Sequence, residues 1–305
     1  MQKVSPKSGI LFAIKRYALH DGPDIRVTIF FKGCPLSCAW CHNPEGITFG
    51  TSIISMPGKC IACHECVSAC PQQALNSTQQ GLTRSTACIR CGECARTCPA
   101  LAHESVGELW DTPKVMAEIE KEIPFFEDGN GGVTFSGGEP LAQPDFLEAL
   151  LMRCGELDLH RAVDTSGFAP RETVERIMPH ADLFLYDIKH MDDARHKAAT
   201  GVGNTQILSN ARLLAESGAR LQLRLPLIPG INDDESNIHE TARFARSLPD
   251  VTGIDVLPYH DTARSKYRKL QMTYPGDHIP SASPERTNWV KTILESYGLN
   301  VRIGG

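Results

Sequence analysis

The chain has 305 residues, of which 41% are hydrophobic and 22% are charged, with a formal net charge of −5. This length and apolar content predict a globular protein of about two domains and exclude a disordered chain. The small acidic charge argues against a nucleic-acid or anionic-membrane partner. Since there is neither an apolar run of about 20 residues nor an N-terminal secretory signal, we expect a cytoplasmic protein with reduced thiols and no membrane partner.

Short apolar runs alternate with helical patterns along most of the chain, which predicts an α/β fold with a parallel sheet. Periodicity alone leaves an open sheet and a partly closed barrel as alternatives. The predicted strands cover residues 26–31, 132–135, 160–164, 183–187, 220–225 and 253–257. The predicted helices cover residues 112–122, 143–155, 171–178, 205–218, 233–247 and 284–297.

The first predicted strand is followed by three closely spaced cysteines, Cys34, Cys38 and Cys41, with no fourth cysteine nearby. Clustered cysteines in a reducing compartment indicate metal ligation rather than disulfides. Three thiolates on a four-iron cluster would leave one iron open to an outside ligand, as a reactive site requires. The alternative at this point is a zinc site that His42 completes.

The α/β alternation stops between about residues 50 and 105, where one cysteine spacing occurs twice. This C-x2-C-x2-C-x3-C-P spacing is that of bacterial ferredoxins, in which the fourth cysteine of each run ligates the other cluster. We therefore expect domains over residues 1–50, 51–105 and 106–305, with two zinc sites as the alternative for the middle one. The expected ligand sets are Cys60, Cys63, Cys66 and Cys98 for one 4Fe-4S cluster and Cys88, Cys91, Cys94 and Cys70 for the other.

The twelfth cysteine, Cys154, stands apart from these clusters in the apolar pattern of a predicted helix. We expect it to be a small buried side chain without a ligand role.

Polar residues follow the later predicted strands. Ser136-Gly137-Gly138-Glu139-Pro140 follows the second strand, and its two glycines allow the backbone to approach a ligand. Asp164 ends the third strand, and Asp187, Ile188 and Lys189 follow the fourth. Because the carboxyl ends of parallel strands meet at one edge of a sheet, these groups are predicted to share one mouth.

Cys34, Cys38 and Cys41, with Trp40 before the last, resemble the C-x3-C-x-aromatic-C signature of radical S-adenosylmethionine enzymes. The segments Asp21–Arg26 and Phe31–Glu45 resemble, more narrowly, the opening of glycyl-radical-enzyme activating enzymes. The resemblance covers nearly the whole chain. It implies a partial (β/α)6 barrel with an inserted ferredoxin-like domain, as in the longer members of this family rather than those similar to pyruvate formate-lyase activating enzyme.

The resemblance also implies roles for individual residues. The open iron of the first cluster would bind the methionine amino and carboxylate groups of S-adenosylmethionine. The two aspartate strand ends would hold a monovalent cation, and Asp21 would lie near the reacting glycine. The cofactor contacts that it implies are Trp40, His42, Gly137, Gly138, Glu139, Asp164, Asp187, Ile188, Lys189, Arg224 and His260. Asp24 departs from the family, which has glycine at that place.

The predicted function is that of an activase with three 4Fe-4S clusters. It cleaves S-adenosylmethionine reductively, and the 5′-deoxyadenosyl radical removes hydrogen from a glycine of a partner glycyl radical enzyme. We expect a monomer that receives electrons from reduced flavodoxin or ferredoxin, with the inserted clusters relaying electrons or docking the partner. The alternatives are a radical enzyme that acts on a small molecule or peptide, and a plain electron carrier.

Overall fold

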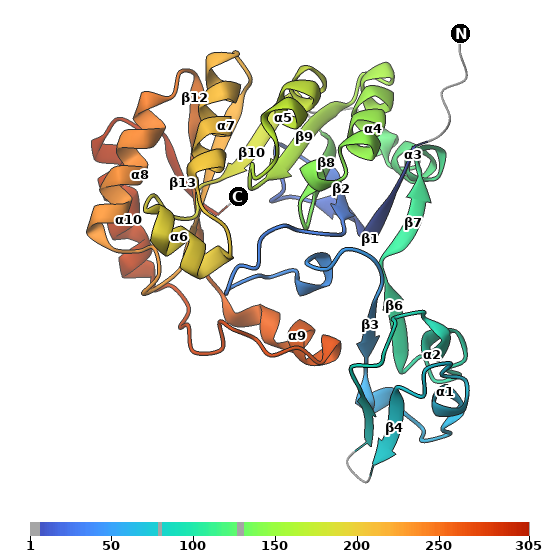
Figure 1. The fold of residues 1–305 in the computed structure, drawn as a ribbon. Coiled ribbons are helices and arrows are strands. Elements are labelled where there is room, and N and C mark those ends of the chain that lie inside the picture. Colours follow the sequence, from blue (N-terminus) through green and yellow to red (C-terminus); the bar gives the residue numbers. More distant parts are fainter. Residues whose placement is uncertain (1–6, 79–80, 127–130, 305) are drawn as a thin grey trace.

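The computed structural model describes residues 7–78, 81–126 and 131–304. The prediction that the N-terminus carries no secretory signal concerns residues 1–6, which lie outside the described part. Within the described residues, a nine-stranded sheet has the order β13-β12-β11-β10-β9-β8-β2-β1-β7 (Figure 1). No helix in these ranges has the length and apolarity needed to cross a membrane.

The six predicted strands form the centre of this sheet, and neighbouring ones pair in parallel. Their carboxyl ends therefore share one edge, as the sequence predicted. The strands are β2 (Arg26–Phe31), β8 (Gly132–Gly137), β9 (His160–Thr165), β10 (Leu183–Asp187), β11 (Leu221–Leu227) and β12 (Val251–Pro258).

Three further strands of this sheet were not predicted. The long strand β1 (Ser8–Ala18) pairs antiparallel with β2, and β7 (Glu108–Asp111) pairs antiparallel with β1. At the other end, β13 (Val301–Ile303) pairs parallel with β12. Because β7 and β13 stand at opposite ends of the strand order, the sheet of the described residues does not close on itself. An open sheet and a partly closed barrel share this strand order, so the partial barrel stays a prediction.

Helices cover the outer face of the sheet (Figure 1). All six predicted helices are present, but α4 continues through Gly155 to Glu156, so this glycine does not end it as expected. Neither α6 nor α9 was predicted. The helices of this body are α3 (Thr112–Glu120), α4 (Pro144–Glu156), α5 (Arg171–Ile177), α6 (Asp193–Thr200), α7 (Thr205–Glu216), α8 (Glu235–Ser247), α9 (Arg264–Leu270) and α10 (Pro284–Ser296). Its 3-10 turns are Pro44–Gly46, Ile123–Phe125, Pro140–Ala142, Met178–His180 and Asp261–Ala263, and a further one, Pro57–Lys59, follows β3 (Ser52–Ser55).

Several helices start at a residue whose side chain caps a free backbone amide. The Lys114 amide donates to Asp111 Oδ1 at 2.9 Å before α3, and the Arg286 amide donates to Ser283 Oγ at 3.1 Å before α10. Such N-caps stabilise a helix by about 1 kcal/mol each. The apolar faces of the helices then pack on the sheet, and Cys154 is fully buried in this core. Its expected structural role is confirmed, and burial raises the pKa of its thiol to about 12.

The segment from β3 to β6 (His103–Val106) projects from the sheet as a separate unit (Figure 1). The chain leaves along β3 and returns along β6, which pair antiparallel. Between them lie α1 (Glu65–Ser68), β4 (Leu75–Thr78), β5 (Gly81–Arg84) and α2 (Glu93–Arg96). The buried cluster of this unit consists, in the described residues, of Ile53, Cys66, Leu75 and Cys94.

Candidate active site

A cavity of about 350 Å³ opens at the carboxyl ends of the six parallel strands. Residues that follow each of these strands line it, which is the place where parallel sheets bind ligands. Of the residues proposed from the sequence, the lining includes Cys34, Cys38, Trp40, Cys41, His42, Gly137, Gly138, Asp164, Asp187, Lys189 and His260.

Backbone hydrogen bonds fix the cysteine loop in place. The Cys34 amide donates to the Ile47 carbonyl at 2.9 Å, which folds the loop back on its own end. The Ser37 and Ala39 amides donate to the carbonyls of Thr200 and Ala199 at 2.7 and 2.9 Å. These carbonyls belong to the last turn of α6, where helix carbonyls lack partners within the helix. The unpredicted helix α6 therefore positions the cysteines.

The three cysteines fit a metal cluster by their donor chemistry. Burial is the main cause that raises the pKa of the Cys34, Cys38 and Cys41 thiols, in the last case to about 12. Buried thiolates need a strong positive partner, and metal coordination deprotonates a thiol outright. Three sulfur ligands in a cavity that polar side chains also line suit a cluster that keeps one iron open.

The zinc alternative required His42 as a fourth ligand. Its Nε2 atom lies 2.8 Å from the carbonyl oxygen of His260, and its ring packs on Tyr259 with centroids 5.5 Å apart. One ring nitrogen is thus occupied by a backbone contact. In the described residues, no group of three or more His, Cys, Asp or Glu side chains is placed to hold a single metal ion.

The turn after β8 lies directly against the cysteine loop. The Gly138 amide donates to the Phe31 carbonyl at 2.7 Å, and the Glu139 amide donates to the Gly33 carbonyl at 2.9 Å. Gly137 has φ +122°, and a Cβ atom on Gly138 would lie 2.4 Å from the Gly33 oxygen. Only glycine permits this backbone-to-backbone approach.

The Glu139 side chain lies behind this turn and does not line the cavity. It is fully buried, and its carboxylate accepts hydrogen bonds from Thr165 Oγ1 at 2.6 Å, the Ser166 amide at 2.9 Å, Ser166 Oγ at 2.5 Å and the Leu141 amide at 3.1 Å. Glu139 therefore ties the ends of β8 and β9 together. The direct contact with a ligand ammonium that the resemblance implied stays a prediction.

Two oppositely charged pairs stand at the strand ends. Arg224 lies 3.0 Å from Asp164, whose other oxygen accepts a hydrogen bond from Ser136 Oγ at 2.7 Å. Lys189 lies 2.6 Å from Asp187. Burial by itself would lower the pKa of the Lys189 ammonium, but the Asp187 carboxylate and nearby cysteines raise it above its ordinary value, so this lysine is cationic.

The other proposed residues lie outside the cavity lining. Arg224 reaches it only through Asp164, and Ile188 is buried in the apolar core. The Asp21 carboxylate accepts a hydrogen bond from Thr28 Oγ1 at 2.7 Å. Asp24 has φ +54°, so the aspartate adopts the left-handed backbone that glycine favours, at a small energetic cost.

Sequence reasoning missed several lining residues, among them Leu36, Asn43 and Ile228. It also gave no role to Tyr259, which packs with Trp40 in a cluster of buried aromatic and aliphatic residues, and whose hydroxyl lies 2.5 Å from that of Tyr274. Leu36 and Asn43 lie within the segment Phe31–Glu45, of which only the cysteines and two of their neighbours were given roles, and no motif marks Ile228 or Tyr259. Their positions beside the cysteine loop and after β11 and β12 were the available signal.

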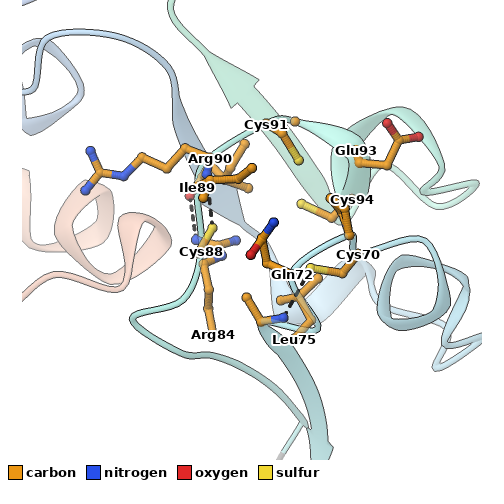
Figure 2. Close-up of a pocket in the computed structure, with 14 residues that line it drawn as sticks. Cys70, Gln72, Leu75, Arg84, Cys88, Ile89, Arg90, Cys91, Glu93 and Cys94 are labelled. Atoms are coloured by element: carbon orange, nitrogen blue, oxygen red, sulfur yellow. Dashed lines mark hydrogen bonds between the residues drawn. The ribbon is translucent and has the colours of Figure 1, made fainter.

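Each of the two cysteine runs in the projecting unit contributes to two further cavities. We call the cavity lined by Cys70, Cys88, Cys91 and Cys94 the near cavity (Figure 2). We call the one lined by Cys60, Cys63, Cys66 and Cys98 the far cavity. In Figure 2, the sulfur atoms of the near cavity face a common space.

The strand pair β3–β6 sets the order of these cavities. Ser52, at the sheet end of β3, accepts a hydrogen bond at 3.0 Å from Lys32 Nζ, next to the cysteine loop. Ile53 lines the near cavity. His103, which pairs with Ser55 two residues further out, lines the far cavity. Two strand residues span about 7 Å, so the far cavity is displaced outward along the strands.

Comparisons with known proteins agree with this geometry. The model of the radical SAM superfamily matches residues 28–245. The trans-4-hydroxy-L-proline dehydratase activating enzyme of Clostridioides difficile is 40% identical over 300 residues, covering 97% of this chain and 99% of that protein. The choline trimethylamine-lyase activating enzyme of Oleidesulfovibrio alaskensis is 37% identical over 304 residues, covering 97% and 98%.

A solved structure is also similar. A domain of the pyruvate-formate lyase-activating enzyme from Bacteroides vulgatus aligns with a TM-score of 0.50 and 41% identity, covering 57% of this chain and 99% of that one. The chain belongs to the radical S-adenosylmethionine superfamily and, within it, to the activating enzymes of glycyl radical enzymes.

Proposed function

We propose that this chain binds a 4Fe-4S cluster through Cys34, Cys38 and Cys41 and activates a glycyl radical enzyme. When bound, the cluster supplies the electron that cleaves S-adenosylmethionine, and the 5′-deoxyadenosyl radical takes a hydrogen atom from a glycine of the partner. The observation that carries the proposal is the single cavity in which these three cysteines face the ends of six parallel strands.

The residues of the chain then hold and orient the cofactor. The cationic Lys189 can pair with the methionine carboxylate of S-adenosylmethionine, and the carboxylates of Asp164 and Asp187 can pair with its ammonium group. Leu36, Trp40, Ile228 and Tyr259 are apolar or aromatic neighbours that limit water around the reacting atoms. A monovalent cation at Asp164 and Asp187 is also part of the proposal, although Arg224 and Lys189 already pair with these carboxylates.

The test is activation of a glycyl radical enzyme in the absence of oxygen. The reconstituted chain, S-adenosylmethionine and reduced flavodoxin are mixed with a candidate partner, chosen from the genes next to that of this chain. We expect a glycyl radical signal in electron paramagnetic resonance (EPR), with about one 5′-deoxyadenosine for each radical. Turnover of a small molecule without any partner protein would favour the alternative enzyme class.

We further propose that the near and far cavities each hold a 4Fe-4S cluster, and that electrons pass from reduced flavodoxin or ferredoxin through them toward Cys34. The geometric support is the order along β3: the near cavity lies between the far cavity and the sheet. Cysteine thiolates in the ferredoxin spacing suit such clusters. The chain would work as a monomer.

Relay and docking predict different results for two matched variants, Cys66→Ala in the far cavity and Cys94→Ala in the near cavity. If the clusters relay electrons, S-adenosylmethionine cleavage driven by flavodoxin falls at least about tenfold more than cleavage driven by dithionite, which reaches the first cluster directly. If they only dock the partner, cleavage with either reductant changes equally and only activation of the partner is lost. Liquid chromatography of 5′-deoxyadenosine measures both rates.

A further inference from the structure

The near and far cavities are related by the repeated cysteine spacing, whose two copies begin 28 residues apart at Cys60 and Cys88. Their linings differ at several equivalent positions, and at one of them the far cavity has a buried imidazole. Cys70 and Cys98 occupy equivalent places, since the Ala74 amide donates to Cys70 Sγ at 3.2 Å and the Ala102 amide donates to Cys98 Sγ at 3.2 Å. The next residue is Leu75 in the near cavity and His103 in the far cavity. An apolar side chain in one copy thus corresponds to an imidazole in the other.

A hydrogen-bond chain holds the His103 ring. Arg84 Nη2 lies 2.9 Å from Ser55 Oγ, and Ser55 Oγ lies 3.0 Å from His103 Nδ1. Arginine can only donate, so Ser55 Oγ accepts from Arg84 and has one proton of its own to give. A serine hydroxyl can also accept twice, so we assign the direction from its own proton: no other acceptor for it is found among the described residues, so Nδ1 accepts it and the ring proton lies on Nε2. Burial and Arg84 lower the pKa of His103, in agreement with a neutral ring.

The Nε2–H group of His103 has no hydrogen-bond partner among residues 7–78, 81–126 and 131–304. The residue is 4% exposed, and its Nε2 atom is buried without a hydrogen bond. A buried unpaired donor costs about 1–3 kcal/mol. An acceptor in the far cavity would remove that cost. His103 lines this cavity together with Cys60, Cys63, Cys66 and Cys98, and a cluster held by these cysteines would supply sulfur acceptors there.

We propose that His103 donates a hydrogen bond from Nε2 to a sulfur atom of the cluster in the far cavity, with Ser55 and Arg84 as positioning residues. Hydrogen bonds to sulfur stabilise the reduced, more negative form of a cluster and set its potential. The far cluster therefore takes up an electron more readily than it would with leucine, the residue that Leu75 supplies in the near cavity. This inference rests on the proposed clusters of both cavities.

The first experiment is a redox titration of the full-length reconstituted chain, followed by EPR, with His103→Leu as the variant. We expect the midpoint potential of one cluster to fall by about 59 mV, which corresponds to a tenfold smaller equilibrium constant for its one-electron reduction. The control, Leu82→Met, changes another residue of the far cavity without removing a donor and leaves all midpoints in place. Unchanged midpoints in His103→Leu, at full iron content, would overturn the proposal.

A second experiment detects the contact between the imidazole and the cluster directly. Protein labelled with ¹⁵N-histidine is reduced, and pulsed EPR records the weak coupling of nitrogen to the cluster. His64 also lines the far cavity, so the coupling must persist in His64→Asn and disappear in His103→Gln. Ser55→Ala, which keeps the ring but frees its tautomer, should weaken it. A coupling that follows His64 instead contradicts the inference.

These measurements separate the failure of this inference from failure of the proposed function. Iron content and cluster signals are obtained without S-adenosylmethionine or a partner protein. If the projecting unit holds no clusters, the proposed electron route fails and this inference fails with it. If the clusters are present but insensitive to His103, only the inference fails.

Discussion

Replacing Cys34, Cys38 and Cys41 together by alanine is expected to abolish 5′-deoxyadenosine formation and to remove about four of about twelve irons per chain. The three thiols line one cavity, and no other cysteine does so among the described residues. Their removal leaves no sulfur ligand there, while the eight cysteines of the projecting unit are untouched. Iron analysis and chromatography of reaction products, both on anaerobically reconstituted protein, measure the two effects.

Cys154→Ala provides the matched control because Cys154 is buried in the main core and belongs to neither kind of cavity. This variant should keep all of its iron and its activity, with a loss of stability of about 1 kcal/mol from the missing sulfur atom. If the triple variant kept about twelve irons, the three cysteines would not be cluster ligands. If Cys154→Ala lost iron, the division of cysteines into ligands and core residues would be wrong.

The central strands were predictable because they are short runs rich in apolar and β-branched residues, most of which are buried. The strand β2, Arg26–Phe31, is an example: five of its six residues are buried. The missed strands carry weaker signals. In β1 much of the C-terminal half is exposed, and β13 has only three residues, so pairing with a neighbouring strand rather than local sequence determines them.

The expected cysteine ligands could be chosen for a different reason: the spacing of cysteines along the chain is typical of iron–sulfur sites. The direction in which a side chain points was harder to predict from the sequence. Ile188 stands between Asp187 and Lys189, which both line the cavity, and it points into the core because neighbouring residues of an extended chain face opposite sides. The support that α6 gives to the cysteine loop was not predictable, since its contacts join residues about 160 positions apart.

The second large effect is expected from Glu139→Leu. Leucine removes the acceptor of four hydrogen bonds, and two of the donors are the backbone amides of Ser166 and Leu141, which cannot turn away. Each buried donor without a partner costs about 1–3 kcal/mol, so the free energy of unfolding should fall by about 2–6 kcal/mol. At roughly 2–4 °C per kcal/mol, anaerobic thermal unfolding of the reconstituted protein will show the loss clearly.

Glu139→Gln distinguishes this structural role from direct contact with the cofactor. The amide of glutamine offers one acceptor and places an NH₂ group against the remaining donors, so stability should fall, though less than with leucine. Thr165→Val, which removes a single hydroxyl donor, should cost about 1 kcal/mol. Because Glu139 fixes the turn at Ser136–Gly138, both Glu139 variants should weaken S-adenosylmethionine binding. The variant with the larger fall in melting temperature should lose more affinity. If Glu139→Gln instead kept the full melting temperature and lost only cofactor affinity, its carboxylate would have to leave Thr165 and Ser166 to contact the ligand, and the turn would be held by its glycine backbone alone.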